Sequence, residues 1–340
     1  MTQTLLRVSN LKVSFETDEA NFVAVDDVSF EIQQGEIVGL VGESGCGKSV
    51  SALSLLRLVP MPPGVIEGGK VDFKGTNLLQ ASIEAVRKVR GREISMIFQE
   101  PLSALSPLQR IGQQMVETIR LHRERSKTEA WQISLEWLGK VNIPDAAEKM
   151  HAYPFQLSGG MQQRIMIAMA LMMNPDLIIA DEPTTALDVT IQAQVFELIR
   201  EMKADRTAIL LITHDMGVVW EMCDRVLVMY ASRIVEKGTT DKLFSAPAHP
   251  YTHSLLKSIP SLSDGKGAKL AVIPGSVPSP ENYPSGCRFR DRCPYAFGRC
   301  SREMPELVPV SAGTRRLVLL QASFLRHKMR NGTGYKAIML

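Results

Sequence analysis

Short runs that alternate apolar and polar residues begin the chain. Residues 11–15, 22–25 and 28–30 each show this period of two, and the polar residues 17–19 interrupt them as a turn would. Alternation of this kind is typical of strands with one buried face. The segment from residue 5 to residue 32 therefore predicts an antiparallel sheet at the edge of the fold.

Continuous apolar runs appear further along and are separated by stretches with helical spacing. The runs are residues 36–41, 177–180, 208–212 and 226–230. Strands that are apolar throughout are typical of a parallel sheet covered by helices on both faces. Helical spacing dominates between residues 82 and 160, for example at Trp131, Leu135 and Leu138, and predicts a helical insertion there. The fold class is α/β.

Proline-rich, irregular sequence follows residue 247 and predicts a small appendage after a main domain that covers residues 1–246. Composition adds little: 39 Lys and Arg against 36 Asp and Glu leave a net charge of +3, which gives no basic face for nucleic acid. The first ten residues lack the apolar core of a signal peptide, and no apolar run approaches about 18 residues. We therefore expect a cytosolic chain that does not span a membrane.

One glycine-rich segment lies between a predicted strand and a predicted helix. It reads Gly42-Glu43-Ser44-Gly45-Cys46-Gly47-Lys48-Ser49. This pattern is typical of a phosphate-binding loop, in which backbone amides surround the phosphates, the lysine reaches the β- and γ-phosphates and the final hydroxyl binds Mg²⁺. The alternative is a glycine-rich turn without a ligand. The strand and helix on either side favour the phosphate-binding loop.

Two carboxylates, Asp181 and Glu182, end the apolar run at 177–180. An acidic pair at a strand end is most often a helix cap or a solvated turn. Together with the phosphate-binding loop, the pair fits a site in which Asp181 holds Mg²⁺ and Glu182 polarises the attacking water.

The sequence Leu157-Ser158-Gly159-Gly160-Met161-Gln162-Gln163-Arg164 resembles the signature loop of ABC-type ATPases. A serine cap with two glycines that open a helix describes the same residues and is compatible with this interpretation. The resemblance implies a P-loop ABC-type ATPase core in which this loop faces the γ-phosphate bound to a second subunit.

Three further residues match motifs of that family in the right order. The resemblance implies that Gln99 touches Mg²⁺ and the attacking water and couples to the membrane partner. It also implies that Asp188 lies in a loop that crosses the dimer interface and that His214 contacts the γ-phosphate and orients Glu182. We expect the catalytic residues to be Glu182, His214 and Gln99.

The resemblance also implies which residues bind the nucleotide. An aromatic residue upstream of the phosphate loop stacks on adenine; Phe15 matches it, Phe22 is the runner-up, and a core phenylalanine is the alternative. The Mg²⁺ ligands are Ser49, Gln99 and Asp181. The nucleotide-binding set comprises Phe15, Gly42, Ser44, Gly45, Cys46, Gly47, Lys48, Ser49, Val50, Gln99, Ser158, Gly159, Gly160, Gln162 and Asp188.

Residues 247–316 resemble the C-terminal extension of ATPase subunits in dipeptide and oligopeptide importers, through the segments 248–252, 286–289 and 292–296. The resemblance implies ATP hydrolysis coupled to peptide uptake. Related machines with this extension carry nickel, glutathione or other small solutes, which remain alternatives. Residues 317–340 depart from the pattern and form a divergent tail.

In relatives the extension holds a [4Fe-4S] cluster through four cysteines. Cys287, Cys293 and Cys300 match the first three, and no fourth cysteine follows. Three hypotheses stay open: a cluster completed by a residue such as His327, a labile or three-iron cluster, and three reduced structural thiols.

One copy of each motif implies that the chain works with other subunits. By resemblance these are a related ATPase that forms a heterodimer with it, two transmembrane permeases and an external peptide-binding protein. The resemblance places this chain at the cytoplasmic side of the inner membrane, as a peripheral subunit. The alternative from another class is a soluble ABC ATPase that acts on ribosomes or DNA. Such proteins usually carry two fused cassettes or a long coiled coil, and neither is visible in the sequence.

Overall fold

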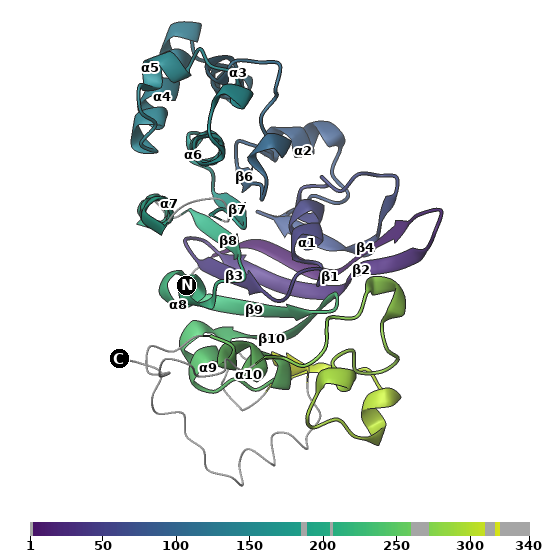
Figure 1. Ribbon diagram of the computed structural model, residues 1–340. Coiled ribbons are helices and arrows are strands. Elements are labelled where there is room, and N and C mark those ends of the chain that lie inside the picture. The colour runs from purple at the N-terminus through teal and green to yellow at the C-terminus, as the bar shows by residue number, and fades with distance from the viewer. Residues whose placement is uncertain (1–2, 185–188, 205–206, 260–271, 310–316, 320–340) are drawn as a thin grey trace. The chain divides into compact units, whose positions relative to one another are not determined.

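The computed structural model describes residues 3–184, 189–204, 207–259, 272–309 and 317–319. Figure 1 labels the helices and strands of the chain, which divides into two compact units. The first unit comprises residues 1–6, 31–37 and 72–212, and the second comprises residues 7–30, 38–71 and 213–340. Each unit is described by itself below.

Three parallel strands form the centre of the first unit. Their order is β8-β7-β6, and Ile97 of β6 pairs with Ala180 of β7. Every residue of β7 and β8 is buried, as their apolar runs predict. The strands are β5 (Thr76–Asn77), β6 (Ile94–Ile97), β7 (Leu177–Asp181) and β8 (Ala208–Ile212).

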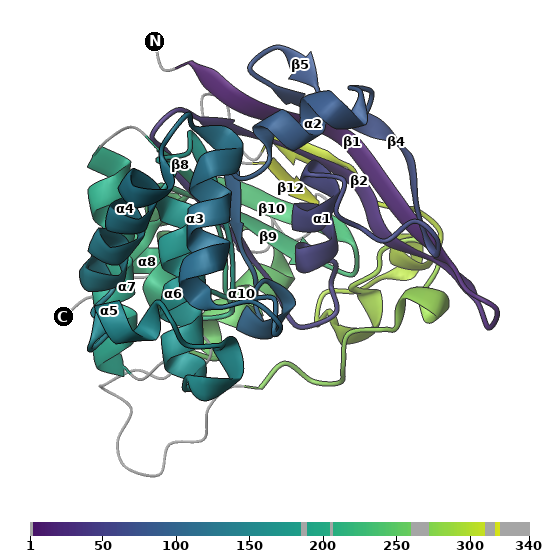
Figure 2. The same ribbon diagram turned by 90° about the horizontal axis from the view of Figure 1, so that it is seen from above.

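Helices make up most of the remainder of the first unit, and α3, α4 and α6 lie side by side in Figure 2. Ser126 and Glu129 form a reciprocal capping box that starts α4. The helices are α2 (Ile83–Val89), α3 (Ile111–His122), α4 (Lys127–Lys140), α5 (Ala146–Lys149), α6 (Gly159–Leu171) and α7 (Val189–Ala204), with 3₁₀ turns η1 (Pro101–Ser103) and η2 (Pro154–Gln156).

The range predicted as a helical insertion, residues 82–160, also contains the strand β6. Its four residues, Ile94–Ile97, are too few to show a strand period between two helical patterns. This strand was therefore missed in the sequence.

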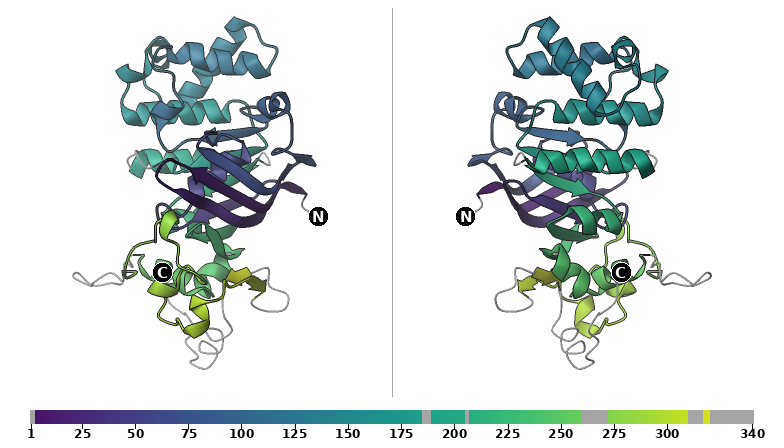
Figure 3. Two further views of the ribbon diagram at one scale, coloured as in Figure 1. Left: turned by 90° about the vertical axis from the view of Figure 1, so that its right-hand side faces the viewer. Right: turned by 90° about the vertical axis from the view of Figure 1, so that its left-hand side faces the viewer.

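The second unit contains the strands predicted at the start of the chain. The long strands β1 (Thr4–Glu16) and β2 (Asn21–Gln33) form a hairpin. The start of β1 and the end of β2 belong to the first unit. At its tip Thr17 donates both its backbone N–H and its hydroxyl to Ala20. The strand β4 (Gly64–Phe73) follows β1 in the sheet order, and the strands, purple to blue in Figure 3, twist together. The predicted antiparallel sheet is confirmed.

A second sheet in this unit has the order β11-β12-β10-β9-β3. Its strands are β3 (Ile37–Val41), β9 (Arg225–Tyr230), β10 (Arg233–Thr239), β11 (Leu307–Pro309) and β12 (Leu317–Leu319). The strand β12 pairs antiparallel with β10, so the first residues of the predicted divergent tail extend this sheet. The helices are α1 (Lys48–Leu55), α8 (Met216–Met222), α9 (Thr240–Ser245) and α10 (Pro250–Lys257), with 3₁₀ turns η3 (Pro280–Asn282), η4 (Arg290–Arg292) and η5 (Gly298–Ser301).

Within the described residues, no helix has both the length and the apolar character needed to cross a membrane.

The beginning of the extension is fixed by a buried glutamate side chain and by a cluster of aromatic rings. The Glu236 side chain, fully buried on β10, accepts the backbone N–H groups of Ala248 and His249, both at 2.9 Å. Nearby, the rings of Tyr230 and Tyr251 lie 4.7 Å apart, and Phe289 packs edge-on against Tyr230 at 5.1 Å. These contacts pack the beginning of the extension against β9 and β10.

His249 makes the stability of the protein depend on pH. Complete burial lowers the pKa of His249 from 6.5 to about 3, and its Nδ1 accepts the N–H of Tyr251 at 3.1 Å. The unfolded chain takes up this proton near pH 6.5, whereas the folded chain does not. Stability should therefore fall as the pH drops from about 6.5 towards 3, by at most about 1.4 kcal/mol per pH unit for this residue.

The matched variant is His249→Asn, since asparagine can cap the same N–H without titrating. Chemical denaturation of both proteins between pH 7 and pH 4.5 gives the free energy of unfolding, and the curve of the variant should be flatter. Parallel curves would contradict the prediction.

Candidate functional site

Steric limits at two glycines shape the phosphate loop in the second unit. Gly42 has φ 153°, and a Cβ placed there would lie 2.1 Å from the carbonyl oxygen of Met229. Gly47 has φ 102°, and its Cβ would lie 2.3 Å from the carbonyl oxygen of Ala24. Because neither position accepts a side chain, the loop backbone runs directly against its neighbours on β9 and β2.

Lys48 is the first residue of α1 and is folded into the loop. Its Nζ donates to the carbonyl oxygens of Gly42 at 2.8 Å and Glu43 at 3.0 Å, and its side chain is 7% exposed. Burial raises the pKa of the Cys46 thiol, so Cys46 acts here as a small uncharged side chain. Ser44 and Gly45 are exposed, while Ser49 and Val50 are half-buried on the first turn of α1.

The two aromatic candidates for adenine stacking contact each other. Phe15 and Phe22 lie on the two strands of the hairpin, with ring centroids 5.5 Å apart and an interplanar angle of 19°. Both rings are half-buried. The sequence left the choice between them open, and the structure joins them in one stack.

His214 also belongs to the second unit. It is exposed and precedes Asp215, which caps α8 by accepting the N–H groups of Gly217 at 2.8 Å and Val218 at 3.2 Å. This cap fixes where α8 begins, and thereby where the backbone of His214 lies.

The first unit brings Gln99 and Glu182 together. Nε2 of Gln99 donates to Oε2 of Glu182 at 3.2 Å, because β6 and β7 are parallel neighbours and both residues follow the same end of the sheet. Glu182 has φ 47°, and its backbone N–H donates to Ile212 at 2.9 Å. Asp181 ends β7 and is 4% exposed.

The signature loop is anchored by glutamines. Ser158 caps α6 and accepts the N–H of Met161 at 3.4 Å, and Ser158 and Gly159 are exposed while Gly160 is half-buried. Nε2 of Gln162 is buried and donates to the carbonyl oxygens of Pro154 at 2.8 Å and Leu157 at 3.1 Å. These bonds position the loop. Asp188 lies outside the described residues.

Gln163 is a residue whose role the sequence did not indicate. It is fully buried, and its Nε2 donates to the carbonyl oxygen of Pro183, the residue after Glu182. The signature helix α6 is thereby tied to the loop that carries the carboxylate. Only the pairing of these two segments in space shows this link.

The cysteines of the extension are the candidate metal ligands of this chain. Among the described residues, no group of three or more His, Cys, Asp or Glu side chains is placed to hold a metal ion. Burial raises the pKa of Cys293 to about 11 and also raises that of Cys287. The described residues therefore give no support to the iron–sulfur cluster, and His327 lies outside them.

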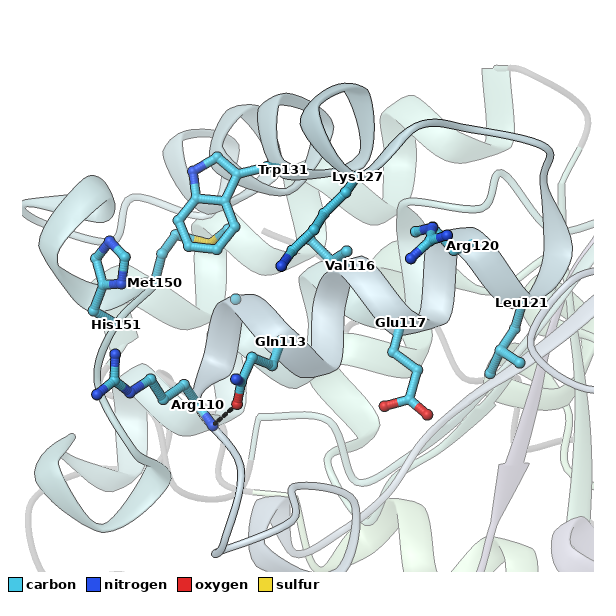
Figure 4. Close-up of a pocket in the computed structure, with 11 residues that line it drawn as sticks. Arg110, Gln113, Val116, Glu117, Arg120, Leu121, Lys127, Trp131, Met150 and His151 are labelled. Carbon is cyan, nitrogen blue, oxygen red and sulfur yellow. Dashed lines mark hydrogen bonds between the residues drawn. The ribbon is translucent and has the colours of Figure 1, made fainter.

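A groove of about 550 Å³ opens between α3 and α4 in the first unit (Figure 4). We call it the α3–α4 groove. Trp131 and Val116 supply apolar surface, and Gly112 leaves room for the Trp131 ring, which a Cβ there would meet at 2.8 Å. Arg110, Arg120 and Lys127 outnumber Glu117 around it. The groove suits a partner segment that is apolar with acidic flanks.

Comparison with known proteins decides the family. Residues 25–185 match the family model "ABC transporter", and residues 235–300 match "Oligopeptide/dipeptide transporter, C-terminal region". A probable peptide ABC transporter ATP-binding protein of Sinorhizobium fredii is 50% identical over 311 residues, which is 91% of this chain and 92% of the relative. The oligopeptide transport ATP-binding protein AppD of Bacillus subtilis is also 50% identical over 311 residues, 91% of this chain and 94% of AppD.

The chain belongs to the ABC transporter family.

A solved ABC cassette agrees with this assignment. It is the dimeric, post-hydrolysis structure of an ATP-binding cassette with ADP and Pi, with a TM-score of 0.63 at 25% identity over 69% of this chain and 98% of that chain. The α/β ABC cassette expected from the motifs is therefore confirmed, and the protein is an ABC-type ATPase.

The Phe15–Phe22 stack generates a prediction about adenine binding by this ABC ATPase. Phe15→Ala should raise the Kd for ATP about fivefold, since stacking of a base on an aromatic ring is worth roughly 1 kcal/mol or more. Phe22→Ala should raise the Kd less, because in this assignment Phe22 only packs against the Phe15 ring. Phe15→Tyr keeps the ring and is the control.

Fluorescence titration with MgATP measures these Kd values. A larger increase in Kd for Phe22→Ala than for Phe15→Ala would assign the adenine contact to Phe22. Unchanged Kd values in both alanine variants would mean that the stack only packs the hairpin.

Proposed function

We propose that this chain is an ATP-hydrolysing subunit of an importer that takes up di- and oligopeptides. The observation that carries the proposal is the match to the C-terminal region of oligopeptide/dipeptide transporters over residues 235–300, together with 50% identity to relatives named for peptide transport. The cassette motifs alone would not separate peptide import from other ABC transport.

The residues of the two units take complementary roles in this proposal. Lys48 binds the β- and γ-phosphates, and Phe15 with Phe22 holds the adenine. Ser49, Gln99 and Asp181 each carry a side-chain oxygen, the kind of ligand that Mg²⁺ prefers, and we assign the ion to them. Bound Mg²⁺ would neutralise charge on the phosphates.

Glu182 is the residue to which we assign polarisation of the attacking water. Its bond to Gln99 at 3.2 Å supports this role, because the amide holds the carboxylate in one orientation. His214 contacts the γ-phosphate and orients Glu182 in the same proposal.

The assembly needs further subunits. We infer that a second ATPase supplies a signature loop equivalent to residues 158–160, and that two permeases provide the route across the membrane while an external protein captures the peptide. The permeases would hold this chain at the cytoplasmic side of the inner membrane. The α3–α4 groove supports this part, as its apolar floor and basic rim suit an amphipathic acidic segment of a permease.

Glu182→Gln separates hydrolysis from binding. The variant should lose more than about 99% of ATP turnover, because the amide cannot accept a proton from water, while its Kd for ATP stays within about twofold. Phosphate release and ATP titration on the same preparation measure both quantities. Normal turnover in this variant would remove Glu182 from the assigned role.

Uptake by cells tests the transport function and its cargo. Cells that carry Lys48→Ala should lose uptake of labelled di- and oligopeptides and keep uptake of nickel, compared with cells that carry the wild-type chain. Loss of nickel uptake alone would mean that the importer carries nickel and not peptides. Loss of neither would contradict the peptide-import proposal.

A further inference from the structure

Glu43, the second residue of the phosphate loop, is held by the C-terminal extension through both its backbone and its side chain. Its N–H donates to the hydroxyl oxygen of Tyr251 on α10 at 2.9 Å. Its carboxylate accepts Nη1 of Arg292 at 2.8 Å and Nη2 at 3.0 Å. These partners lie 208 and 249 residues away along the chain, and all three residues belong to the second unit.

Arg292 is built into this position. Its side chain is 5% exposed, and Nε donates to the carbonyl oxygen of Pro274 at 2.8 Å. Burial acts to lower the pKa of Arg292, but the hydrogen bonds to Glu43 and the nearby Tyr230 outweigh it and raise the pKa, so the guanidinium stays charged. A planar guanidinium that binds a carboxylate with two parallel bonds fixes its orientation as well as its distance.

The same loop residue also holds the phosphate-binding lysine. The carbonyl oxygen of Glu43 accepts Nζ of Lys48 at 3.0 Å. A continuous set of hydrogen bonds therefore runs from Arg292 and Tyr251 through Glu43 to Lys48. The extension therefore contacts the phosphate loop at Glu43, the same residue that orients Lys48.

We propose that Arg292 is a positioning residue for nucleotide binding, through which the C-terminal extension holds the phosphate loop ready for ATP and neutralises the Glu43 carboxylate beside the triphosphate. This inference rests on the proposed ATPase function and deepens it. Arg292 touches neither substrate nor reacting atoms in this role. A loop held in its binding geometry loses less conformational freedom when the ligand binds.

Removal of Arg292 has two consequences for ATP. The loop loses its side-chain tether, the Arg292–Glu43 ion pair, while the Tyr251 bond remains, and an uncompensated carboxylate faces a highly charged anion. Arg292→Ala should therefore raise the Kd of the purified full chain for MgATP about tenfold, as measured by titration with a fluorescent ATP analogue. Arg292→Lys keeps the charge without the two parallel bonds and should restore most of the affinity.

Arg290 provides the matched control. It lies in the same 3₁₀ turn η4, and its guanidinium bonds Ser285 and Ser301 inside the extension. Arg290→Ala should lower the unfolding temperature as Arg292→Ala does, yet leave the Kd within about twofold. If the two variants raised the Kd equally, Arg292 would have only a structural role.

Glu43→Ala distinguishes the charge from the tether. This variant loses the tether but also the carboxylate, so its Kd should rise only about threefold, and the double variant with Arg292→Ala should bind as Glu43→Ala does. A double variant as weak as Arg292→Ala would contradict the neutralising role. A wild-type chain that binds no ATP would refute the proposed function itself, whereas normal wild-type binding with an unaffected Arg292→Ala would refute only the positioning role.

Discussion

The close approach of the phosphate loop to two strand carbonyls is the constraint on which the second unit depends. Gly42 and Gly47 lie so near Met229 and Ala24 that any side chain would collide with backbone oxygen. The loop amides can then turn inwards only because both positions carry glycine, and Lys48 follows as the first residue of α1. The loop shape is thus a property of the surrounding sheet as much as of the motif.

In the first unit the corresponding constraint is the parallel pairing of β6 and β7. Because parallel strands end at the same edge, Gln99 and Glu182 leave the sheet together and can bond. Gln163 then links the signature helix to Pro183 through a hydrogen bond to its carbonyl oxygen. A shift in the register of either strand would separate an amide and a carboxylate that the chemistry needs side by side.

Local patterns predicted much of this molecule and left out the long-range contacts. The apolar runs of β3, β7, β8 and β9 and the glycines of the loop have signatures that lie within a few residues, so fold and motifs followed from them. The strand β6 is only four residues long, and Gln163 resembles any polar residue of a helix. The iron–sulfur cluster, one of the alternatives for the three cysteines, finds no support among the described residues, because spacing in sequence alone does not place three thiols around one ion.

The extension shows why position in space matters more than motif here. Its cysteines suggested a metal as its organising element, yet its contacts are those of Tyr251 and Phe289 with Tyr230 on β9 and two partly buried ion pairs. Arg288 pairs with Asp26 at 2.5 Å, and Arg292 pairs with Glu43. Buried ion pairs add little net stability but fix geometry strictly, since a misplaced partner leaves a charge unpaired. The extension is held in a fixed position by these pairs. Through Arg292 and Glu43 it therefore also fixes the position of the loop that carries Lys48.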